Sequence, residues 1–299
     1  MFFQGESRES VTNYPRLDPR KGGRIWELDF LRGFMIILMC LDHFMFDLSQ
    51  MFAKTWIAQG GGAAAVAKFA RMWWDHGASW VGETRDIIQV IALCVFFGLC
   101  GGSTIFSRDN LSRAMKTLLA ASVITIGTFL AARFDIISKS DVITFGVLHM
   151  LSFATLIVSA VYALSRLFKG KGDLVFVIAS AVLAGLVFLA DHLIKEGGVT
   201  EDIRLMFLHR SFSRISWMGG DYFPLIPYLG YAFAGAAIVT LFYGGGKTLL
   251  PKLDGAWNKP FRFVGKHTLL IVIVHQVANM LILALVTAAF VDGGNFVIF

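Results

Sequence analysis

Seven apolar stretches follow one another along this chain, and each is long enough to cross a membrane as a helix. About 20 predominantly apolar residues span roughly 30 Å of hydrocarbon. Of the 299 residues, 56% are hydrophobic and only 16% are charged, which disfavours a soluble protein with seven buried helices. The sequence therefore predicts an all-α fold, a polytopic transmembrane helix bundle of about seven or more spans. The predicted spans are residues 28–52, 86–106, 112–132, 143–166, 173–194, 222–243 and 267–290.

The lysines and arginines are distributed unevenly between the two sides of this predicted bundle. Of the 27, 16 lie in the N-terminal segment and in or beside the loops after the second, fourth and sixth spans, whereas 10 lie in the other loops and Arg32 lies inside the first span. Cytosolic loops are enriched in Lys and Arg, so the N-terminus is predicted to be cytosolic. We expect a cytosolic tail at 1–25, a transmembrane domain at 26–292 and a short external tail at 293–299. The net charge of +6 reflects this bias, and no nucleic-acid partner is predicted.

Ionisable residues interrupt the first apolar stretch in a regular pattern. At 100° per residue, Asp29, Arg32, His43 and Asp47 share a helical stripe about 60° wide. Asp42 lies about 100° away from His43 and points elsewhere. Asp29 and Arg32 have a plainer interpretation as an ion pair at the helix end. Because charged groups inside a membrane helix are costly and usually functional, the stripe is expected to face the bundle interior and to mark a site.

Other polar residues occur in later spans and in the outer loops. His149 lies one turn inside the fourth span, and His275-Gln276 lies near the middle of the last one. His76 and Asp221 belong to outer loops. Their plainer interpretations are hydrogen-bonded core histidines, an interfacial histidine among tryptophans and a cap of the following helix. No H-E-x-x-H sequence or i, i+4 histidine pair is present, so no metal site is predicted.

The second span ends in Gly101-Gly102-Ser103, and Arg108 follows it at the cytosolic side. Closely spaced glycines usually allow two helix backbones to approach each other. They would also let a slender ligand pass close to the backbone. Arg32 and Arg108 could then contact phosphate groups of that ligand.

Several short motifs follow one another in a characteristic order along nearly the whole chain after the N-terminal tail. They are Arg24, Asp29, Arg32-Gly33, Met39 and His43, then Gly101-Gly102-Ser103, Gly146-Val-Leu-His149, Asp221-Tyr-Phe-Pro-Leu-Ile-Pro227, Gly265-Lys-His267-Thr-Leu-Leu and His275-Gln276. This order resembles the bacterial members of the heparan-alpha-glucosaminide N-acetyltransferase-like membrane acyltransferases. The resemblance implies a multi-pass enzyme of the plasma membrane.

The resemblance also implies transfer of an acyl group from cytosolic acyl-CoA, with acetyl-CoA the expected donor. The acceptor would be the hydroxyl or amine of a sugar, a glycan or a related compound at the outer face. In the lysosomal enzyme, an asparagine and a histidine after the first helix form the catalytic pair. His43 falls where that asparagine lies, and His76 resembles the histidine, so either one is a candidate base. Asp42, Asp47 and Asp75 are candidate carboxylates to orient it.

The remaining roles rest on the residue patterns described above together with this resemblance. The expected acyl-CoA-binding residues are Arg32, Gly101, Gly102, Ser103 and Arg108. The expected supporting polar network is Asp29, His149, Asp221, His275 and Gln276. No metal cofactor is implied.

Two other functional classes stay open at this stage. A proton-coupled transporter of a small solute would use the same histidines and carboxylates to carry protons. A scaffold protein would not require four ionisable groups in one stripe. Membrane lipid is an expected partner of the acyltransferase, and whether it forms a homodimer stays open.

The predicted topology has a direct test. With a cytosolic N-terminus and seven spans, a reporter fused after Phe299 should be exported. A C-terminal reporter that is active only in the cytosol would show that a span has been miscounted, most plausibly in the segments 54–85 or 197–221.

Overall fold

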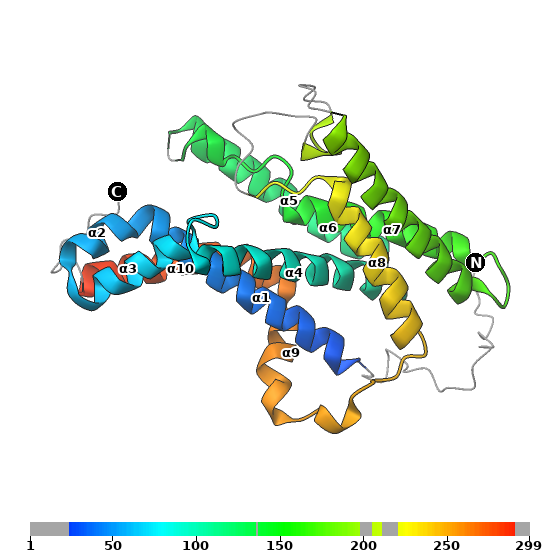
Figure 1. Cartoon of the computed structure of the whole chain (residues 1–299). Helices are drawn as coiled ribbons and strands as arrows, with labels where there is room; N and C mark the ends of the chain where they lie inside the picture. The colour runs from blue at the N-terminus through cyan, green and yellow to red at the C-terminus, as the bar shows by residue number, and fades with distance from the viewer. Residues whose placement is uncertain (1–23, 136, 198–204, 211–220, 291–299) are drawn as a thin grey trace. The chain divides into compact units, whose positions relative to one another are not determined.

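The computed structural model describes residues 24–135, 137–197, 205–210 and 221–290 (Figure 1). Every regular element of that part of the chain is a helix, and an isolated bridge joins His209 to Ile226. The prediction of an all-α fold is confirmed. The predicted external tail at 293–299 lies outside the described residues, as does the predicted cytosolic tail up to residue 23.

Two compact units make up the chain. The central unit is Cys94–Lys252, and the first-helix unit combines Trp26–Leu93 with the residues from Leu253 onward. The long helix α4 (Trp80–Gly102) contributes residues to both. The transmembrane domain expected at 26–292 therefore consists of two units, and its outer boundaries stay a prediction.

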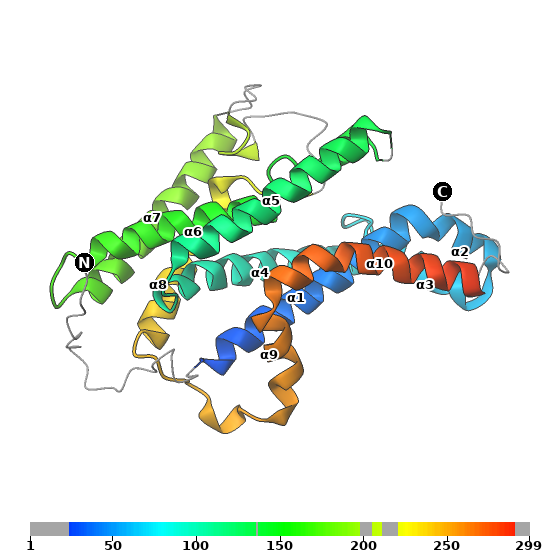
Figure 2. The ribbon, with the colours of Figure 1, turned by 180° about the vertical axis from the view of Figure 1, so that it is seen from behind.

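In the first-helix unit, α1 and α10 lie side by side (Figure 2). A short π-helical segment continues α1 directly into α2, so the chain stays helical up to a turn at Gly60, whose φ is +80°. Its helical elements are α1 (Trp26–Asp47), the π-helix (Leu48–Phe52), α2 (Ala53–Gln59), α3 (Gly61–Trp73), the first part of α4, a 3-10 turn (Ala256–Asn258), α9 (Lys259–Lys266) and α10 (Thr268–Phe290).

The segment between the first two predicted spans is more ordered than its sequence indicates. It contains α2 and α3, which pack on each other and against the end of α10. Leu48, Trp56 and Leu283 are buried in their shared core, and Trp56 Nε1 donates to Thr287 Oγ1 at 2.8 Å. This small core fixes the end of α1 that follows the polar stripe.

Helices α1 and α9 cross at two glycines. A Cβ atom at Gly33 would collide with the Phe261 carbonyl, and one at Gly265 would collide with the Asp29 carbonyl. Only hydrogen at both positions permits this backbone approach. The Arg32-Gly33 and Gly265-Lys-His267 motifs, which are more than 200 residues apart, are therefore the two halves of one helix contact.

The central unit contains four long helices, and α6 contacts α5, α7 and α8 (Figures 1 and 2). The last part of α4 joins them at its glycines, because a Cβ at Gly101 would collide with the Ala232 carbonyl of α8 and one at Gly102 would meet Val239. Its helical elements are the end of α4, a 3-10 turn (Ser103–Ile105), α5 (Asn110–Arg133), a 3-10 turn (Lys139–Asp141), α6 (Val147–Ser165), α7 (Gly172–Glu196) and α8 (Leu225–Tyr243).

Six helices of the described residues are long and apolar enough to cross a membrane. They are α4, α5, α6, α7, α8 and α10, which match six of the seven predicted spans. The chain is therefore a multi-pass membrane protein. Helix α1 has 22 residues but carries Glu27, Asp29, Arg32, Asp42 and Asp47. It is not among those six, so the seventh span stays a prediction.

The glycine crossing can be tested by adding one methyl group. Gly33→Ala should lower the free energy of unfolding by roughly 1–3 kcal/mol, the usual cost of overpacking, because its Cβ meets backbone atoms that cannot move aside. The measurement is thermal unfolding of the detergent-solubilised protein.

A matched control is Gly185→Ala on α7, where an added Cβ meets no atom within 4 Å. This variant should unfold at the parent temperature or slightly above it, because alanine favours a helix over glycine. Equal unfolding temperatures for the two variants would contradict the close crossing of α1 and α9.

Candidate active site

The polar stripe of α1 faces α10, as its spacing predicts. His43 Nδ1 lies 2.6 Å from His275 Nε2, and the two rings lie 4.9 Å apart at an interplanar angle of 27°. One turn further along α1, Gln276 Nε2 donates to Asp47 Oδ1 at 2.7 Å. Asp47 is 1% exposed. The structure thus brings together two predicted catalytic residues and two predicted network residues.

The N-terminal end of the stripe forms its own ion pair. Arg32 Nη1 lies 3.0 Å from Asp29 Oδ1, and Asp29 is 5% exposed beside the α9 crossing. This is the helix-end pairing considered from the sequence. Because Arg32 already contacts a buried carboxylate, a role for it in phosphate binding would require the guanidinium to serve both partners.

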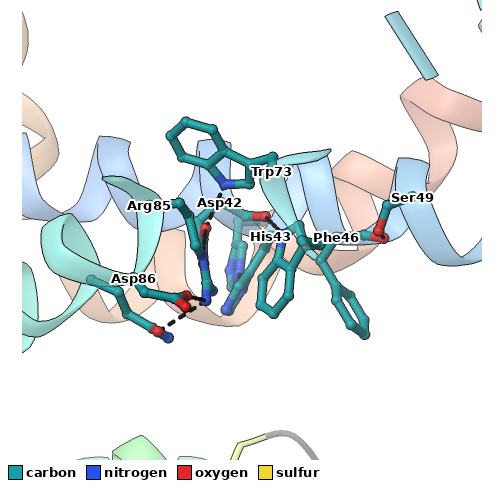
Figure 3. A network of polar contacts seen from close by, with 10 residues as sticks. Asp42, His43, Phe46, Ser49, Trp73, Arg85 and Asp86 are labelled. Atoms are coloured by element: carbon teal, nitrogen blue, oxygen red, sulfur yellow. Dashed lines mark hydrogen bonds and ion pairs between the residues drawn. The ribbon is translucent and has the colours of Figure 1, made fainter. Parts of the chain in front are cut away.

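Asp42 is held by an arginine that the sequence placed in a loop (Figure 3). Arg85 Nε donates to Asp42 Oδ1 at 2.9 Å and Arg85 Nη2 donates to Oδ2 at 2.7 Å, a two-pronged pairing. The Nη1 group donates to Asp86 and Gln89, each at 3.0 Å. Arg85 is only 3% exposed. Its charge is therefore fully engaged inside the unit.

Two adjacent tryptophans complete the surroundings of Asp42. Trp73 Nε1 donates to Asp42 Oδ1 at 2.9 Å, and Trp74 Nε1 donates to the Asp42 carbonyl at 3.2 Å. The Arg85 guanidinium lies 3.7 Å from the centre of the Trp74 ring, within range of a cation–π interaction. Trp73 thus binds the carboxylate of Asp42 and Trp74 binds its backbone carbonyl, contacts that the interpretation of His76 as an interfacial histidine among tryptophans does not predict.

His76 is next to this network and exposed. Its ring packs edge-on against Trp74 with 5.8 Å between ring centres. Its φ is +52°, and Gly77 follows with a φ of +80°, so the chain turns sharply here before α4 begins. Ser79 Oγ accepts a hydrogen bond from the Gly82 amide at that helix start. This cap, visible in the sequence, is the signal that would have placed Arg85 on a helix.

The central unit joins two other predicted residues around the start of α6. Both carboxylate oxygens of Asp221 accept from the Val147 amide, at 3.2 and 3.3 Å. Asp221 therefore caps α6, and the expectation that it caps the following helix is wrong. His149 Nδ1 accepts from the Gly146 amide at 3.3 Å. Burial raises the pKa of the Asp221 carboxyl to about 6, although the Val147 hydrogen bond opposes this shift.

The predicted donor-binding residues of the central unit already have protein contacts. Gly101 and Gly102 pack on α8. Ser103 Oγ donates to the Cys100 carbonyl at 2.8 Å and accepts from Arg113 Nη1 at 3.0 Å. The glycines thus serve helix packing, and a contact of this segment with acyl-CoA stays a prediction. Within the described ranges, no group of three or more His, Cys, Asp or Glu side chains is arranged to hold a metal ion.

Comparison with known proteins gives one family. The sequence model described as heparan-alpha-glucosaminide N-acetyltransferase, catalytic, matches residues 24–277. The match includes both histidines of the α1–α10 pair. No curated protein and no solved structure matches the chain.

The Asp42–Arg85 pair generates a stability prediction. Asp42→Asn should lower the free energy of unfolding by roughly 3 kcal/mol, because removing one partner leaves a buried charge poorly compensated. Thermal or denaturant unfolding in detergent measures the effect.

The control is Asp173→Asn, whose carboxylate also lies 2.7 Å from its arginine, Arg166, but is 46% exposed. Exposed pairs contribute about 0–1 kcal/mol, so this variant should remain close to the parent. A loss of stability as small for Asp42→Asn would mean that the buried pair does not support the unit.

Proposed function

The chain belongs to the heparan-alpha-glucosaminide N-acetyltransferase catalytic family, and from that premise we propose that it is an acyl-CoA-dependent acyltransferase of the plasma membrane. It moves an acetyl or other acyl group from cytosolic acyl-CoA to a hydroxyl or amine of a sugar or glycan at the outer face. The family match over residues 24–277 supports membrane acetyl transfer. The His43–His275 contact is the observation that supports a proton-transfer site on the first helix.

The chemistry requires little more than a base and a donor of hydrogen bonds. A thioester is already activated, so the acceptor must lose a proton and the developing oxyanion must be stabilised. In the proposed reaction, His43 Nε2 takes the proton of the acceptor as its oxygen or nitrogen attacks the thioester carbonyl carbon. The carbon–sulfur bond then breaks, and the leaving CoA thiolate takes the proton from His43. The products are the acylated acceptor and free CoA.

His76 is the second candidate for the base. Its exposure and its position beside Trp74 suit a residue that meets an acceptor arriving from solvent. The Trp74 indole donates to the carbonyl of Asp42, the residue directly before His43. Asp42 supports this arrangement by fixing both tryptophans and Arg85, and Asp47 by pairing with Gln276.

The donor is proposed to bind near Arg32, Gly101, Gly102, Ser103 and Arg108. Basic side chains suit the phosphates of CoA, and membrane lipid surrounds the apolar helices. Arg32→Ala and Arg108→Ala should weaken CoA binding if this assignment is right. Unchanged affinity in both variants would remove these residues from the donor site.

The central experiment follows release of free thiol from acetyl-CoA by the purified protein in detergent, with and without a panel of sugar acceptors. His43→Ala should lower turnover by roughly 10²–10⁴-fold, the usual contribution of a positioned base. His76→Ala should also lower it substantially, and the more severe loss identifies the base.

His192→Ala is the matched control, because this histidine of α7 is 66% exposed and pairs only loosely with Glu196 at 3.4 Å. It should retain parental turnover. Normal turnover in both His43→Ala and His76→Ala would refute the catalytic assignment and make His149 or His275 the next candidate. A proton-coupled solute transporter, the alternative function, would neither bind nor cleave acetyl-CoA.

A further inference from the structure

The protonation of His275 is fixed by its own helix. Its Nδ1 atom lies 2.8 Å from the Val272 carbonyl oxygen, three residues earlier on α10. A carbonyl oxygen can only accept a hydrogen bond, so this ring nitrogen must carry the proton. A neutral imidazole has a single N–H group, and Nε2 of His275 is therefore left as an acceptor.

The acceptor nitrogen of His275 in turn determines the protonation of His43. Its Nδ1 lies 2.6 Å from the acceptor Nε2 of His275. Two lone pairs cannot share a hydrogen bond, so His43 Nδ1 must donate. The proton of neutral His43 then resides on Nδ1, and its Nε2 holds a free lone pair. A general base requires that lone pair.

The neighbouring charges leave this assignment in place. Both oxygens of Asp42 are bound by Arg85, and Oδ1 also accepts from Trp73. Asp47 accepts from Gln276. If His275 Nε2 donated to His43 Nδ1 instead, both nitrogens of His275 would carry a proton. The ring would then be charged between two largely apolar helices, where an unpaired charge is costly.

The contact is held in register by residues on either side. Gln276 bonds to Asp47, and Asn279 Nδ2 donates to the Cys40 carbonyl at 3.2 Å. Three polar contacts thus connect α1 to α10 over about two helical turns. Loss of the Asn279 bond alone leaves two of these contacts between the helices.

We propose that His275 is a positioning residue that holds His43 in the tautomer with its lone pair on Nε2. The inference rests on the proposed acyl transfer with His43 as base. When His43 Nε2 accepts the acceptor's proton, the Nδ1–H group still donates to His275 and shares the positive charge. The proton then passes from Nε2 to the CoA thiolate, which restores the starting tautomer of both rings.

Two substitutions at position 275 separate this role from ring packing. His275→Gln keeps a side-chain oxygen that can accept from His43 Nδ1, whereas His275→Phe keeps a flat ring and removes the acceptor. We expect His275→Phe to lower kcat about 10–100-fold, the scale of the loss when the partner that orients a metal-bound histidine is removed, with KM for acetyl-CoA unchanged. His275→Gln should retain most of the parental kcat.

Asn279→Leu is the matched control, because it removes another α1–α10 hydrogen bond without contacting His43. It should keep kcat near the parental value even if it lowers the unfolding temperature. His275→Leu serves as a second acceptor-free variant and should fall with His275→Phe, so a folding failure of one still leaves the comparison intact.

The outcomes are distinct. A His275→Phe enzyme with parental kcat, or a His275→Gln enzyme as impaired as His275→Phe, would overturn the positioning role while acyl transfer stands. A parent protein that neither binds nor cleaves acetyl-CoA would instead overturn the proposed function.

Discussion

A polar side chain inside an apolar helix bundle needs a partner within the protein, on its own helix or on a neighbouring one, because neither lipid nor hydrocarbon side chains can supply one. This constraint organises the first-helix unit. Helix α1 presents Cys40, His43 and Asp47 to α10, and Asp42 to α4, where Arg85 binds it. Each contact fixes the rotation of α1 about its axis. The chemistry proposed for His43 depends on that rotation.

Small residues make these contacts reachable. Hydrogen bonds between side chains of adjacent helices need backbones close to one another, and the glycines of α1 and α9 provide that approach at the N-terminal end of the stripe. The central unit uses the same device where Gly98, Gly101 and Gly102 meet α8. The glycine-containing motifs thus have a packing role in both units, including Gly101-Gly102, for which the sequence also allowed a ligand-binding role.

The sequence predicts helix length and the stripe because both are local properties, readable from apolar runs and a 100° repeat. It does not predict which partner each residue meets. His43 and His275 are 232 residues apart, and nothing in their local sequence pairs them. Helices α2 and α3 were missed because they are only 7 and 13 residues long, too short to register as spans. Arg85 was assigned to a loop for a different reason. Helix α4 begins at Trp80, several residues before the apolar run from which the span was predicted.

Their hydrogen bonds also give His43 and His149 different chemical capabilities. His149 Nδ1 accepts from the Gly146 amide, so its proton must lie on Nε2. That nitrogen can donate to a developing negative charge but cannot take a proton while the ring is neutral. His43 has the opposite arrangement, with its free lone pair on Nε2. Acyl transfer requires one group of each kind, a base and a hydrogen-bond donor. The bonding of His149 in the central unit therefore suits it to donate a hydrogen bond and not to act as a base, whereas the bonding of His43 suits it to accept a proton.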